Sequence, residues 1–436
     1  MRGYCLLISM LLVTGAMAQA PQGTTVSTQM ETPPPVSALS YSTQVGSGVG
    51  HNYLRGGVIY TTSYVDNYLV GTNSAKLAET MFSALATVTL DTATSRQRVG
   101  LTYSPGFTFY RPSSSLNEVD NTAVVNYDLR LTPHTALSII ERFQDSSSPY
   151  SPEDAGSGSV SGAPVSTTPG VVPPFAKLLT NSVSAEITAQ AGLNEMVGVS
   201  GSSMFLHYPN ASQTPGLADS SSRGGTAFYN HRISSLQYVG VTYQYMDMLT
   251  TPVGSESATT TSTVMGYYSI YPRARLSLSI SGGPQYYRTT GTSMADTSSW
   301  APAVTASMGW QADRVSLAGS YSQSVTAAGG LLGAFHTKSA NAAVRWRVAR
   351  AWSIGGSGSY AINRAAGAGL ETESTNGHSL SGSAMLQHPI GRQLSLTFNY
   401  DRIHQEYDGV AAIAANPDSD RLSFSISWKF QRPLGK

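Results

Sequence analysis

The sequence predicts an all-β protein that forms a single closed antiparallel transmembrane β-barrel of about 18 strands, with 16 strands as the second choice. Three observations support this fold class. Segments of about ten residues alternate apolar and polar side chains, the period of a strand with two different faces. Short turns alternate with longer connectors rich in Ser, Gly and Pro. Charged residues make up only 12% of the 436 residues, about half the share in a soluble globular domain.

The composition excludes several other classes of protein. Hydrophobic residues make up 41% of the chain, and Ser, Thr, Gly, Asn and Gln take the place of the missing charge. No apolar run of about 18 residues follows the N-terminus, so we do not expect a helical membrane protein. The formal net charge is +1, so we expect no nucleic-acid partner. A single Cys excludes a secreted domain held together by disulfides.

The N-terminus has the pattern of a secretory signal peptide. Arg2 supplies a positive charge, and Cys5–Val13 is an apolar segment too short to span a membrane. The small residues Ala16 and Ala18 follow at the spacing that cleavage requires, so cleavage is expected after Ala18, or alternatively after Ala20. We therefore expect an exported protein whose mature chain contains no thiol.

The rest of the chain divides into three predicted parts. A flexible leader is expected at 19–55, because Thr24–Pro35 is rich in Thr, Gln and Pro and has no period. The barrel is expected over 56–430, where segments with strand-like alternation recur between turns and connectors. A short tail, 431–436, follows it.

Each predicted strand has one apolar and one polar face, and the polar faces carry mostly Ser, Thr, Gly and Asn. Such side chains suit a water-filled lumen better than the charged exterior of a soluble sandwich. In lipid every backbone polar group must be paired, and only closure removes the sheet edges. The clearest apolar faces, in chain order, are Val99, Leu101, Tyr103, Phe107 and Phe109; Ala123, Val125, Tyr127, Leu129 and Leu131; Leu276, Leu278 and Ile280; Trp352, Ile354, Tyr360 and Ile362; Leu394, Leu396, Phe398 and Tyr400; and Leu422, Phe424, Ile426, Trp428 and Phe430.

The end of the last strand resembles the assembly signal of bacterial outer-membrane β-barrel proteins. In this signal apolar residues alternate and an aromatic pair closes the strand. The residues that carry it here are Phe424, Ile426, Trp428 and Phe430. The resemblance covers about 56–430 and extends more loosely to porin-like members, although six residues follow the last aromatic ring. It implies a Gram-negative outer-membrane location with both termini periplasmic. It also implies membrane lipid, lipopolysaccharide and the barrel-assembly machinery as partners.

The sequence lacks the motifs of a catalytic or cofactor site. It contains no GxSxG, no P-loop and no complete GxGxxG motif, and no two His lie within five positions of each other. We therefore expect no enzyme, no cofactor and no metal site. The function expected instead is passive diffusion of small hydrophilic solutes through a porin-like channel. The alternative is a non-channel or export-associated barrel that acts as a surface interaction or polysaccharide-secretion component.

The placement of charge suggests a polarised pore. Basic residues gather at the short turns, and acidic residues, such as Glu118, Asp120, Asp418 and Asp420, gather in the long connectors. A basic periplasmic end would lower the barrier for anions, although turns and loops hold most charges in any β-protein. The basic residues expected to line the pore are Arg98, Arg130, Arg275, Arg345, Arg347 and Lys429.

The longest connector, Asp145–Leu178, is the third on its side of the predicted barrel. The resemblance to general porins implies that such a loop folds into the lumen and that its acidic residues face a basic wall. Glu153 and Asp154 would be those acidic residues here. The Ser, Gly and Pro in this connector fit equally well a loop that stays outside the barrel.

Overall fold

A computed structural model describes the chain over 52–67, 78–146, 177–209, 217–251, 256–273, 275–291, 294–327, 333–349, 351–366, 376–408 and 418–434. These residues form eighteen β-strands and one 3-10 turn, η1 (Ser114–Leu116). None of their helical segments is long and apolar enough to cross a membrane. The strands are β1 (Tyr53–Val65), β2 (Glu79–Ala93), β3 (Gln97–Arg111), β4 (Glu118–Thr132), β5 (Thr135–Ser146), β6 (Leu178–Gly192), β7 (Glu195–His207), β8 (Asp219–Ser234), β9 (Gln237–Thr251), β10 (Ser257–Arg273), β11 (Leu276–Gly291), β12 (Met294–Gln311), β13 (Val315–Ala327), β14 (Ala334–Ala349), β15 (Trp352–Ala365), β16 (Gly377–Ile390), β17 (Leu394–Tyr407) and β18 (Asp418–Pro433).

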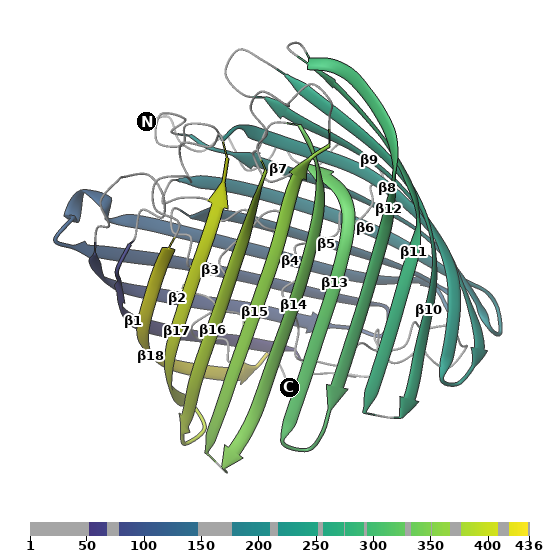
Figure 1. Ribbon diagram of the computed structural model, residues 1–436. Coiled ribbons are helices and arrows are strands. Elements are labelled where there is room, and N and C mark those ends of the chain that lie inside the picture. Colours follow the sequence, from purple (N-terminus) through teal and green to yellow (C-terminus); the bar gives the residue numbers. More distant parts are fainter. Residues whose placement is uncertain are drawn as a thin grey trace, which may run out of the picture.

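The strands form one closed ring. Each strand pairs antiparallel with the next along the chain, and β18 pairs with β1 from Tyr53↔Pro433 to Val65↔Arg421. In Figure 1 the strands β13–β17 lie in front of β2–β6 and run at a steep angle to them, as the tilted strands of a barrel do when seen from the side. Closure leaves no edge strand. The predicted fold class, a single closed 18-stranded antiparallel barrel, is confirmed.

The two rims of the barrel differ in their connections. At the short-turn rim, two or three residues join β2 to β3, β4 to β5 and each later pair of this kind. The described chain begins and ends at this rim, where the Leu434 N–H donates to the Asn52 carbonyl at 2.7 Å. The opposite rim, called here the long-loop rim, has mostly longer connections, with a two-residue link between β11 and β12 as the exception.

Side chains alternate between the outer and inner faces as the sequence predicts for the last strand. Leu422 is 61% exposed on the outer face of β18, whereas Ser425 is 1% exposed on the inner face. The Ser425 hydroxyl shares a hydrogen bond of 2.9 Å with Thr61 of β1. On the outer face the Phe424 ring packs beside Phe398 of β17 with centroids 4.8 Å apart. The apolar side chains on the outer faces of the strands, called here the apolar girdle, therefore face outward, and the hydroxyl-rich faces line the interior.

Arginine in place of Ile426 is expected to destabilise the inserted barrel by about 2–4 kcal/mol, because Ile426 lies near the middle of β18 on the outer face. Leu422→Arg is the matched control, since this residue lies nearer the long-loop rim, where the cost falls to about 0–1 kcal/mol. Guanidinium unfolding in lipid vesicles measures both. Equal losses at the two positions would mean that Ile426 does not face the hydrocarbon layer.

Candidate functional site

The inner wall of the barrel consists largely of hydroxyl and amide side chains. Hydroxyls on neighbouring strands bond one another in ladders, which pair polar groups that point away from lipid. The same chemistry recurs around the ring. Examples are Ser357 with Ser383 at 2.7 Å, Ser395 with Ser427 at 2.5 Å, Ser269 with Ser279 at 2.9 Å and Thr259 with Thr289 at 3.1 Å. This wall is the candidate functional surface.

Five of the six basic residues expected in the pore lie on strand segments of the inner face, in the half of the barrel next to the short-turn rim. Each shares a face with buried Ser or Thr of its own strand or of the paired strand. The five are Arg98, Arg130, Arg345, Arg347 and Lys429. Arg275 differs, because it lies in the turn between β10 and β11 and pairs with Asp313 of the next turn at 2.8 Å.

Two of these basic residues have defined partners on the wall. Arg98 makes two bonds to the Asp91 carboxylate of β2, at 2.9 and 3.2 Å. Asp91 also lies within the field of Arg55, an inner-face residue of β1 that the sequence reasoning missed. The Arg345 guanidinium donates to the Gln387 carbonyl oxygen at 3.2 Å. The charge of Arg98 is therefore balanced locally, whereas Arg345 keeps its charge beside a neutral amide.

The acidic residues are distributed differently from the sequence expectation. Glu118 and Asp120 do not lie in a connector but on β4, facing inward near the long-loop rim, where the Tyr110 hydroxyl donates to Glu118 at 2.8 Å. Asp418 and Asp420 lie on β18 and face outward. The expectation was wrong because the strands continue past the apolar girdle, so residues that look like loop charges belong to strand ends.

A buried ion pair stands in the inner wall between β17 and β18. The Arg421 guanidinium contacts the Asp401 carboxylate at 2.7 and 2.9 Å, and the two side chains are 6% and 1% exposed. The pair lies directly opposite in the β-ladder. A pair so deeply buried interacts strongly, since little water screens it. No sequence signal singled it out.

An apolar cluster spans the interior at the long-loop rim. Its members come from two regions that lie six to nine strands apart in the ring of eighteen, and therefore from opposite walls. One group belongs to β6, β7 and the segment that leads into β8, and the other to β14 and β17. The buried members are Leu178, Leu206, Tyr208, Leu217, Phe335 and Tyr407. This set is called the mouth cluster below.

The bend of β13 explains how opposite walls can meet. β12 and β13 pair only from Val304↔Gln323 to Gln311↔Ser316 and diverge toward the long-loop rim (Figure 1). Beyond that point the Val325 backbone bonds the side chain of Gln285 on β11, through contacts of 2.7 and 3.2 Å. β13 thus passes over the inner face of β12. The ends of β13 and the strands that follow it are carried into the lumen.

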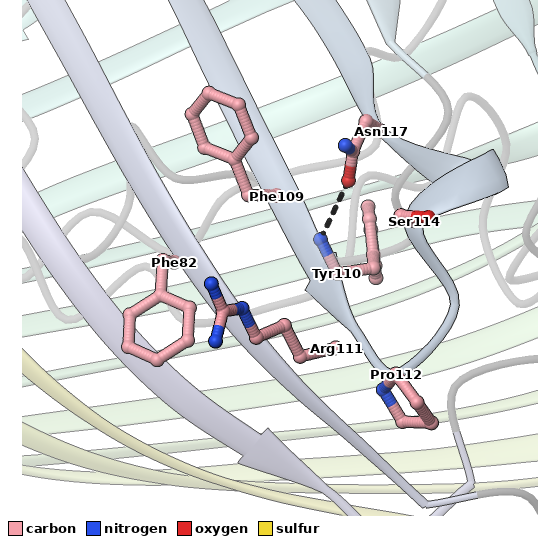
Figure 2. A pocket seen from close by; sticks show the side chains of 7 residues that line it. All are labelled: Phe82, Phe109, Tyr110, Arg111, Pro112, Ser114 and Asn117. Carbon is pink, nitrogen blue, oxygen red and sulfur yellow. Dashed lines mark hydrogen bonds between the residues drawn. The ribbon is translucent and has the colours of Figure 1, made fainter.

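A surface pocket lies outside the lumen, at the end of β3 next to η1 (Figure 2). Phe82, Phe109 and Arg111 line it from the outer face of β2 and β3, and the Tyr110 N–H donates to Asn117 at 2.9 Å beside it. This pocket is therefore not part of a transport path.

The acidic pair expected at a constriction, Glu153 and Asp154, lies outside the described residues, and its contact with the basic wall stays a prediction.

The closed ring, the apolar outer face and the polar interior define a transmembrane β-barrel of the outer-membrane class. No family model matches the chain, and no curated protein matches it. Solved structures similar to it include the ferric citrate transporter FecA, with a TM-score of 0.45, 11% identity, and coverage of 88% of this chain and 79% of that one. Pseudomonas aeruginosa OccK2 (OpdF) has a TM-score of 0.44 and 10% identity, with coverage of 87% of this chain and 98% of that one. Acinetobacter baumannii OccAB4 has a TM-score of 0.43 and 8% identity, with coverage of 88% of this chain and 100% of that one. Similarity at this level concerns the fold alone.

Proposed function

We propose that the protein is an outer-membrane porin-like channel for passive diffusion of small hydrophilic solutes, with a mild preference for anions. The observation that carries the proposal is the inner wall, which is polar between the mouth cluster and the short-turn rim and basic next to that rim. A ring of 16–18 strands encloses a space too wide for side chains alone to fill, so it suits an aqueous path. The inward Arg and Lys residues would lower the barrier for anions.

Among the basic residues, Arg345 and Arg347 are the most important for selectivity in this proposal. They lie two positions apart on the inner face of β14, and the Arg345 guanidinium donates to the uncharged amide of Gln387. Arg98 contributes less, because Asp91 balances its charge. Solutes would therefore pass a positive surface on the β14 side of the short-turn half.

The mouth cluster is the closed state of this channel. Among the described residues, opposite walls meet there through side chains and bent strand ends, while most of the ladder stays paired. Two arrangements of the same strand ends, in contact or apart, would give a closed and an open channel.

The proposed orientation places the short-turn rim and both ends of the described chain in the periplasm. Phe424, Ile426, Trp428 and Phe430 would then serve the barrel-assembly machinery, since they form a continuous outward stripe at the last strand. Lipid and lipopolysaccharide would surround the apolar girdle. Neither a cofactor nor a catalytic group is part of the proposal.

The purified barrel is expected to give discrete conductance steps in a planar bilayer, with a reversal potential that indicates modest anion preference. Replacing Arg345 and Arg347 with Gln should shift the reversal potential toward cations, because two positive charges leave the inner wall. Arg223→Gln with Arg288→Gln is the matched control, since it removes the same charge from the outer face. Identical reversal potentials for all three proteins in a salt gradient would contradict the role of the basic wall.

The competing function is a non-channel or export-associated barrel, and the mouth cluster is the observation that favours it. Apolar contacts join opposite walls of the lumen there, as they would in a barrel that does not conduct. The protein would then act through its outer surface or with a secretion partner. Silence of a variant whose mouth cluster has been removed would support this alternative over the channel.

A further inference from the structure

Three side chains with metal-binding chemistry meet on the outer face near the long-loop rim. His378 lies on β16, and His404 and Glu406 lie two positions apart on β17. The β-ladder sets His378 directly opposite Glu406, so all three project to the same side of the sheet. Their nearest ligand atoms, two imidazole nitrogens and a carboxylate oxygen, lie within 4.8 Å of one another.

A fourth residue orients one of these ligands. The Asp418 carboxylate of β18 lies 3.0 Å from Nδ1 of His404. A carboxylate that accepts from one ring nitrogen leaves the other nitrogen as a metal ligand and holds the ring in place. The Arg402 guanidinium lies 3.5 Å from the Asp418 carboxylate and 3.6 Å from the Asp420 carboxylate. Arg402 therefore also holds Asp418 in place.

The position of the cluster gives an ion access from outside the membrane. On the same outer face, Leu380 and Tyr400 lie on the girdle side of the cluster, while Arg402, Asp418 and Asp420 lie beside it at the polar end of the strands. Both imidazoles are half-buried and Glu406 is exposed. The ligands are therefore held by neighbouring side chains yet face the aqueous layer beyond the girdle.

We propose that His378, His404 and Glu406 bind a divalent transition-metal ion of the Zn²⁺ type, with Asp418 as the positioning residue for His404. Imidazole nitrogen with one carboxylate suits Zn²⁺, whereas Ca²⁺ and Mg²⁺ require mostly oxygen ligands. At Zn–N distances of about 2.0–2.1 Å, tetrahedral ligand atoms lie roughly 3.3 Å apart. Binding would therefore draw the three ligand atoms together from their present spacing of up to 4.8 Å. Water would complete the coordination.

The strand pairing is what makes the site specific. His404 and Glu406 alternate with inward residues, so the two-residue step along β17 and the cross-strand partner on β16 place all three ligands on one face. Metal binding would join β16 to β17 at their long-loop ends. Tyr407, which belongs to the mouth cluster, follows Glu406 directly and points to the other face.

The experiment is a calorimetric titration of ZnCl₂ into the untagged full-length barrel, folded in detergent without lipopolysaccharide and stripped with a chelator. One Zn²⁺ per chain is expected at this site. Asp418→Asn should weaken binding by about 10–100-fold, and His378→Ala and His404→Ala by at least as much. His388→Ala is the matched control, because this residue lies on the same face of β16 at the opposite rim and bonds the Ala351 carbonyl. Its affinity should equal that of the unchanged protein.

Two further measurements keep the result interpretable. Heat-modified mobility on a gel verifies that each variant is a folded barrel, and Glu406→Gln removes a ligand charge with minimal change of shape. Co²⁺ provides a visible absorption band whose loss in His404→Ala reports direct coordination. The proposal is overturned if no Zn²⁺ binds, or if binding keeps its affinity in the His378→Ala, His404→Ala double variant.

Discussion

Replacing Phe335 and Tyr407 with Ala is expected to turn a barrel that is mostly closed into one that conducts steadily. The two rings are 0% and 1% exposed, and they supply the contribution of β14 and β17 to the mouth cluster. Truncating a buried aromatic ring costs about 3–5 kcal/mol. If these rings are exposed to water in the open state, their truncation removes packing energy mainly from the closed state. Since about 1.4 kcal/mol is tenfold in an equilibrium, even one truncation should raise the open fraction by roughly two orders of magnitude or more.

Single-channel recording measures this effect as the fraction of time spent open. Phe398→Ala is a suitable control, because it removes an aromatic ring of the same size from the outer face of β17, where the ring stacks on Phe424. That variant should gate like the unchanged protein. If the Phe335→Ala, Tyr407→Ala variant folds but never conducts, the channel function is wrong and the non-channel alternative stands.

Arg421→Met is expected to cost about 3–5 kcal/mol of barrel stability, because it leaves the Asp401 carboxylate buried without its cation. The two side chains lie opposite each other on adjacent strands at 2.7 Å, and the Asp401 side chain is 1% exposed. The apolar double variant Asp401→Leu, Arg421→Met should recover most of the loss, since no buried charge remains.

Guanidinium unfolding of the three proteins in lipid vesicles tests this expectation. Asp313→Ala offers a comparison, because it breaks the Arg275–Asp313 pair, whose side chains are mostly exposed at the short-turn rim. Exposed ion pairs contribute little, so its midpoint should hardly move. If the double variant is as unstable as Arg421→Met alone, the expectation is wrong, because the loss then does not come from an unpaired buried charge.

The outer face of the barrel illustrates what local sequence determines. Leu422, Ile426 and Trp428 alternate with Ser, and that period of two specifies which side chains face lipid once the sheet closes. The same rule placed Arg98 and Arg345 on the inner face without knowledge of their neighbours. It did not place Arg275, because a turn residue has no strand parity.

Contacts across the barrel carry no such periodic signal. Leu178 and Phe335 are apolar residues at the ends of strands, and the sequence does not distinguish them from girdle residues that face lipid. Their meeting depends on β13 leaving β12, which is a property of the whole ring. Arg421 and Asp401, twenty positions apart along the chain, meet instead through the register of the adjacent strands β17 and β18, which the sequence does not specify either.

The His residues show this difference most clearly. His378 and His404 are too far apart along the chain to form a helical zinc motif, so the sequence predicts no metal site. The sequence by itself determined a closed barrel and its strand faces, because alternation and turn spacing are local. Only the tertiary structure decided the mouth cluster, the buried ion pair and the His378–His404–Glu406 group. These depend on strand register and on the bending of strand ends, which bring distant residues together without any repeated pattern.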